Sequence, residues 1–77
     1  MPANVLSELG VGRAATVSGV DGEGAVVVRL LEMGFVPGTP VQLVKAAPLG
    51  DPLLFRVRGY HISLRRAEAA RIRVETS

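Results

Sequence analysis

The chain has 77 residues, 48% of them hydrophobic but few aromatic, and a formal net charge of +2, so it has room for one domain with a core of Val, Leu, Ile and Ala. It contains no cysteine, which excludes disulfides, zinc–thiolate sites and thiol chemistry. The longest apolar run, GAVVV, is far shorter than the ~20 residues of a membrane span, and MPANVLSELG does not resemble a secretory signal, so we expect a soluble, cytoplasmic single domain over residues 1–77.

The first half of the chain predicts a short turn, a strand and a helix. After a turn in LSELGVG, residues 13–20 alternate so that Ala15 and Val17 share one face of a strand. Apolar residues then recur at helical spacing over residues 24–33. The three valines of this segment favour a strand, but RLLEM is a strong helix former and Gly34 lies where a left-handed helix cap belongs. We therefore predict a helix there.

A glycine–proline joint connects this helix to the next strand. Gly34 can adopt positive φ and end the helix at no steric cost. Pro37-Gly38 predicts a tight turn into the strand TPVQLVKA, with Val41 and Leu43 facing inward. The joint therefore redirects the chain within very few residues.

The second half predicts a loop, a β-hairpin, a helical turn and a closing strand. The loop APLGDP, residues 47–52, precedes alternating strands in LLFRVRG and YHISLR, which a turn at Gly59 joins. In the second of these strands we expect Tyr60, Ile62 and Leu64 to face inward. RAEAA then forms a helical turn, and RIRVE forms the last strand.

About five short strands, one α-helix and a helical turn indicate a mainly β fold. A sheet this small is best closed into a barrel, because closure leaves no edge strand free to aggregate. We therefore expect a small barrel.

Positive charge gathers near the C-terminal end of the chain. Residues 56–73 hold six arginines against one acid, Glu68, whereas the residues before them sum to about −2, with three basic against five acidic side chains. The six are Arg56, Arg58, Arg65, Arg66, Arg71 and Arg73. Such a surface could face an acidic protein, an anionic lipid or a nucleic acid. The alternation favours a simpler interpretation, that these arginines form the solvated faces of strands.

No group of residues indicates a catalytic or metal site. His61 is the single histidine and is expected to face solvent beside Ser63, and no second soft ligand supports a transition-metal site. The carboxylates of Asp21, Glu23 and Asp51 fall in different loops, without a partner base for acid–base chemistry. DGEG lacks the Lys-Ser/Thr of a phosphate-binding loop. We expect no catalytic residue, no metal ligand and no cofactor.

The loop APLGDP has two compatible interpretations. In the structural one, Pro48 and Pro52 stiffen the loop, Gly50 permits its turn and Asp51 closes it with a side-chain hydrogen bond. In the functional one, Leu49 projects from the stiffened loop and anchors in a pocket of a partner protein.

The stretch RLLEMGFVPGTPVQLVKAAPLGDPLLFRVRGYHISLRRAEAARIRVE resembles the FeoA family, the small cytosolic component of bacterial ferrous iron transport. The likeness runs from about Leu6 to Glu75. The residues that match the family pattern are Leu30, Leu31, Gly34, Pro37, Gly38, residues 47–52, Leu64 and Arg65. The chain departs from the pattern at His61 and at Val27 and Val28, where the family has polar or charged residues. If exposed, these valines add an apolar patch for contact or self-association.

The resemblance implies an SH3-like barrel, in agreement with the strand count, and no catalytic activity. It also implies a partner, the membrane transporter FeoB with its cytosolic G-protein domain, whose assembly or activity the chain would modulate. We expect no nucleic-acid partner, no membrane insertion, and a monomer or weak homo-oligomer. The residues that we assign to partner binding are Pro48, Leu49, Asp51, Arg65 and Arg66. The residues that we assign to structural turns are Gly34, Pro37, Gly38 and Gly59.

Two alternative functions use a similar barrel. One is a regulatory domain of iron-responsive repressors, but the chain has no helix-turn-helix and no room for one. The other is a nucleic-acid-binding small barrel unrelated to transport, which the six arginines suggest. It is disfavoured because Tyr60 and Phe55, both predicted inward, leave little aromatic surface to stack on bases.

Overall fold

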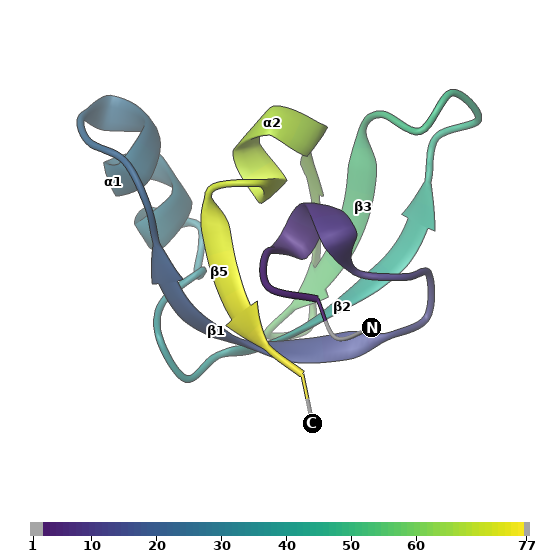
Figure 1. The fold of residues 1–77 in the computed structure, drawn as a ribbon, viewed down its shortest axis with the longest axis horizontal. Helices are drawn as coiled ribbons and strands as arrows, with labels where there is room; N and C mark the ends of the chain where they lie inside the picture. The colour runs from purple at the N-terminus through teal and green to yellow at the C-terminus, as the bar shows by residue number, and fades with distance from the viewer. Residues whose placement is uncertain (1–2, 77) are drawn as a thin grey trace.

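The computed structural model describes residues 3–76, which form a strongly curved, five-stranded antiparallel sheet with two short α-helices and one 3₁₀ helix (Figure 1). In chain order the elements are η1 (Leu6–Glu8), β1 (Ala14–Val20), α1 (Ala25–Glu32), β2 (Pro40–Ala46), β3 (Leu53–Val57), β4 (Tyr60–Leu64), α2 (Arg66–Ala69) and β5 (Ile72–Glu75). The strand order across the sheet is β4-β3-β2-β1-β5. The mainly β architecture and every predicted element are therefore confirmed.

The sheet curls without closing through hydrogen bonds. β4 and β5 lie at its two ends and do not pair within residues 3–76. η1 contacts both α2 and β5, so short helices rather than a strand pair cover this side of the core (Figure 1). The expectation that closure leaves no edge strand is wrong, because the segment after β4 turns into α2 instead of pairing with β5.

The end of α1 explains how a valine-rich segment forms a helix. The N–H of Phe35 donates to the carbonyl of Leu30 at 3.2 Å, and the N–H of Gly34 donates to that of Leu31 at 3.0 Å. With Gly34 at φ 112°, this is a Schellman C-terminal cap. The side chains of Leu30 and Phe35 are both fully buried. Tertiary packing and the cap therefore outweigh the weak helix propensity of the valines.

Two tight turns redirect the chain. At Pro37-Gly38 the N–H of Thr39 donates to the carbonyl of Val36 at 3.1 Å, and Gly38 has φ 91°, as a type II turn requires. Between β3 and β4, Gly59 at φ 83° follows a second residue with positive φ, an arginine at position 58 with φ 52°. The turns predicted at these glycines are confirmed, whereas the left-handed arginine has no signal in the sequence.

The core gathers the inward faces of the strands together with η1, α1 and α2. Its largest fully buried side chains are Phe35, Phe55, Leu6, Leu30, Leu53, Leu64, Ile72, Val17, Val41 and Val57. The prediction that Tyr60 faces inward is wrong, because its side chain is 73% exposed. It is the first residue of an edge strand, directly after the hairpin turn, so no neighbouring strand covers it on one side.

Candidate docking surface

The loop of residues 47–52 is closed by its own backbone. The N–H of Gly50 donates to the carbonyl of Ala47 at 2.7 Å, and the N–H of Ala47 donates to the carbonyl of Pro52 at 3.0 Å. At the tip, Leu49 is 98% exposed. A large apolar side chain thus stands in solvent on a closed turn, which is the arrangement that the anchor interpretation requires.

Arg66 ties this loop to two other segments. Its Nε and Nη2 donate to the carbonyl of Gly50 at 3.1 and 2.8 Å, and its Nη1 donates to the carbonyl of Ser7 at 2.9 Å. The backbone N–H of Arg66 also donates to Oδ1 of Asp51 at 3.0 Å. Asp51 therefore fixes the loop to the start of α2 rather than closing it on itself. Both side chains support the loop that carries Leu49.

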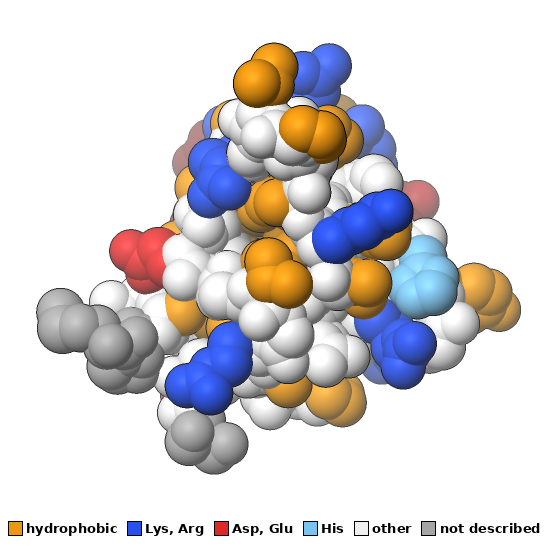
Figure 2. Space-filling view, turned by 90° about the vertical axis from the view of Figure 1, so that its right-hand side faces the viewer, with side chains coloured by type: hydrophobic (Ala, Val, Ile, Leu, Met, Phe, Trp, Pro, Cys, Tyr) orange, Lys and Arg blue, Asp and Glu red, His pale blue; other side chains and the backbone are white. Residues whose placement is uncertain are grey.

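The other arginines divide into bound and solvated side chains. Arg73 donates from Nε to Oδ1 of Asp21 at 2.7 Å, and Arg58 donates from Nη2 to Oγ1 of Thr39 at 3.2 Å. The side chains of Arg56, Arg65 and Arg71 are exposed. Figure 2 shows the face on the β2–β3 side, where blue Lys and Arg side chains stand around the pale-blue histidine and red acidic side chains are few. The excess positive charge therefore lies on the surface.

The outer side of α1 carries an apolar surface that the sequence only raised as a possibility. Val28 is 52% exposed, Leu31 37% and Val26 36%, whereas Val27 is half-buried. Arg29, between these residues, forms an ion pair with Glu68 of α2, which links the two helices at the surface. The unusual valines are thus split, one toward the core and one toward solvent.

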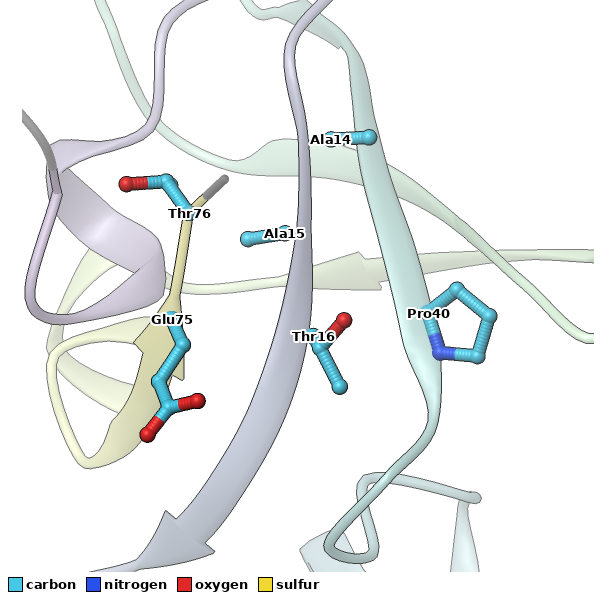
Figure 3. A pocket seen from close by; sticks show the side chains of 6 residues that line it. All are labelled: Ala14, Ala15, Thr16, Pro40, Glu75 and Thr76. Atoms are coloured by element: carbon cyan, nitrogen blue, oxygen red, sulfur yellow. The ribbon is translucent and has the colours of Figure 1, made fainter.

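A shallow depression of about 350 Å³ lies on the sheet across β1, β2 and β5. Figure 3 shows Thr16 of β1 between Pro40 of β2 and Glu75 of β5, in agreement with the strand register. The other lining residues are Ala14, Ala15 and Thr76. Glu75 is the one ionisable group among them, so this depression holds no acid–base pair.

The part of the chain that the structure describes shows neither a cluster of metal ligands nor a membrane-spanning helix. No three His, Cys, Asp or Glu side chains converge into a possible metal site within residues 3–76. His61 is exposed and lies opposite Arg56 in the β3–β4 register, next to a positive charge that disfavours a bound cation. In the same part of the chain, no helix has the length and apolar character to cross a membrane.

Comparison with known proteins identifies the family. The FeoA domain profile matches residues 4–76. The Fe(2+) transport protein A/Fe(2+) transporter FeoB fusion protein of Porphyromonas gingivalis is 49% identical over 70 residues, which cover 91% of this chain but only 8% of the fusion protein. This chain thus spans a small part of that relative.

Solved structures of FeoA proteins are similar to this chain in sequence and in fold. FeoA from Chlorobium tepidum is 40% identical, with a TM-score of 0.86 over 94% of this chain and 69% of that one. FeoA from Stenotrophomonas maltophilia, complexed with zinc and described as a unique prokaryotic SH3 domain protein, is 39% identical, with a TM-score of 0.84 over 95% of this chain and 91% of that one. The SH3-like fold is therefore confirmed, and the chain belongs to the FeoA domain family.

Proposed function

We propose that this chain is a cytosolic accessory protein of bacterial ferrous iron uptake, which docks on the G-protein part of a FeoB-type transporter and modulates its assembly or activity. The observation that carries the proposal is the Porphyromonas gingivalis fusion, in which a region similar to 91% of this chain is joined to a FeoB transporter. Two modules joined in one chain stay at high effective concentration, which favours modules that act together.

The loop of residues 47–52 supplies the contact in this proposal. Complete burial of a leucine side chain in a partner pocket contributes roughly 1.5–3 kcal/mol. Because Arg66 and Asp51 already hold the loop, docking of Leu49 loses little conformational entropy. Pro48 lies beside the anchor, and Arg65 adds an exposed positive charge at the start of α2, which suits an acidic partner surface.

The mechanism needs no chemistry from the chain itself. It acts by surface complementarity, with binding that stabilises one state of the transporter's cytosolic part over another. Such a role requires neither a cofactor nor a nucleophile.

Binding of the purified chain to the cytosolic part of FeoB from the same genome, measured by titration calorimetry, tests the proposal. We expect Leu49→Glu to lower affinity at least about tenfold while the melting temperature stays unchanged. Val11→Glu is the matched control, because Val11 is also exposed, at 63%, in a different loop. Full-strength binding by Leu49→Glu contradicts the assigned contact, and no binding by the unmodified chain contradicts the docking itself.

A further inference from the structure

Among the residues that the structure describes, no segment pairs with the outer edge of β4. At the other end, the N-terminal segment covers β5: the N–H of Val74 donates to the carbonyl of Asn4 at 2.9 Å, and Val5 forms a bridge with Arg73. Within residues 3–76, β4 pairs only with β3. A free strand edge can accept a further strand from another chain.

The register determines which backbone groups of β4 point outward. The two-residue turn makes Val57 and Tyr60 a hydrogen-bonded pair, and pairs alternate along an antiparallel ladder. The N–H and C=O groups of His61 and Ser63 therefore point away from β3. No backbone hydrogen bond joins these groups to any other segment of the described chain. β4 thus presents two donors and two acceptors at the spacing of a strand.

Few of the usual protective devices guard this edge. Protected edges carry prolines, charged side chains or bulges. The strand YHISL contains no Pro, Lys, Arg, Asp or Glu, and its register with β3 runs without interruption, whereas the β1–β5 and β2–β3 pairs both contain irregularities. The edge is therefore regular, and its exposed Tyr60 and half-buried Ile62 offer apolar contact to an added strand.

Positive charge around β4 favours an acidic partner strand. Exposed Arg56 lies opposite His61, and Arg58 and Arg65 stand just before and just after β4. The segment from Leu53 to Arg65 contains no acidic residue. An incoming strand that places a carboxylate beside His61 gains charge complementarity with Arg56, the cross-strand neighbour of His61. A second copy of this chain is disfavoured, because it would bring the same arginines to the shared edge and no acidic residue between Leu53 and Arg65 to balance them.

We propose that β4 binds an extended acidic segment of another protein as a sixth strand. In this segment acidic residues alternate with apolar ones: the apolar side chains pack beside Tyr60 and Ile62, and the acidic ones face His61 and Arg56. This binding surface differs from the Leu49 loop and does not depend on the identity of the transporter.

The test is an NMR titration of the ¹⁵N-labelled chain with a capped peptide of roughly seven residues that alternates Glu or Asp with Val or Ile. We expect hydrogen exchange at the His61 and Ser63 amides to slow at least about tenfold, since these amides gain a hydrogen-bond partner. A peptide with Lys at each acidic position, and an acidic peptide with Pro at its centre, should leave both amides unchanged.

A charge reversal separates this surface from general attraction. Arg56→Glu should weaken binding of the acidic peptide about tenfold, while Arg71→Glu, outside the hairpin, should change it little. Equal binding of the proline-containing peptide would overturn the proposal, because strand addition needs its backbone donors. So would slow exchange at both amides in the free protein at high concentration, which indicates self-pairing, or an oligonucleotide that displaces the peptide.

Discussion

The guanidinium of Arg66 donates two hydrogen bonds to the carbonyl oxygen of Gly50, from Nε at 3.1 Å and from Nη2 at 2.8 Å. Its third nitrogen, Nη1, reaches the carbonyl of Ser7 at 2.9 Å. One planar side chain therefore joins η1, α2 and the loop of residues 47–52. Lysine cannot replace this geometry, because an ammonium lacks the fixed fork of donors.

Arg66→Lys should therefore loosen the loop. We expect it to lower the free energy of unfolding by about 1–2 kcal/mol, because carbonyl oxygens lose charge-assisted partners. Hydrogen exchange at the Gly50 amide, which donates to Ala47, should accelerate. Denaturant melts and exchange measurements check both effects. Arg71→Lys is the control, and equal stability of the two variants would contradict the role of Arg66.

Gly34 should tolerate no side chain. It has φ 112°, and an added Cβ would lie 3.5 Å from Cγ1 of Val57, so the cost comes mainly from the backbone rather than from a clash. Gly34→Ala should lower the free energy of unfolding by about 1–3 kcal/mol, and Gly34→Val should unfold or severely destabilise the domain. Thermal melts measure both. Gly10→Ala, at a glycine without positive φ, should cost less, and an equally stable Gly34→Val would refute the cap.

The hairpin turn should prefer asparagine to alanine at position 58. Arg58 has φ 52°, a conformation that asparagine adopts more readily than most residues, and its Nη2 donates to Oγ1 of buried Thr39. Both substitutions lose that hydrogen bond, but only Asn relieves the backbone. Arg58→Asn should therefore be more stable than Arg58→Ala by about 1 kcal/mol in chemical denaturation. The reverse order would contradict the idea that the left-handed backbone at position 58 limits this turn.

The two unusual valines should respond differently to charge. Val28 is 52% exposed, so Val28→Lys should leave stability unchanged or raise it by up to about 0.5 kcal/mol through better helix propensity. Val27 is half-buried and lies close to Gly22: a Cβ at position 22 would be 3.5 Å from Cγ2 of Val27. Val27→Lys should therefore cost about 1–2 kcal/mol. Urea melts of the two variants test whether Val27 faces the core and Val28 faces solvent. Equal stability of the two variants would contradict this assignment.

Local patterns were sufficient for most of the fold. Alternation located all five strands because apolar residues recur at alternate positions, although in β4 only Leu64 is buried. Gly34 and Pro37-Gly38 have backbone requirements that few other residues meet. The helix over α1 conflicted with the propensity of its valines, and the burial of Leu30 and Phe35 decided it. The prediction that Tyr60 faces inward was wrong, because alternation gives the face of a strand but not whether a neighbouring element covers that face.

The position of the candidate docking surface could be predicted from the sequence, but the contacts that hold it together could not. The sequence by itself determined the element order, the exposed loop of residues 47–52 and the family, because these depend on neighbouring residues and on matched motifs. Only the tertiary structure decided that Arg66 reaches Gly50 and Ser7, which are 16 and 59 residues away, and that β4 pairs with no strand but β3 among residues 3–76. Both are contacts or absences between distant segments, which depend on the packing of the whole chain.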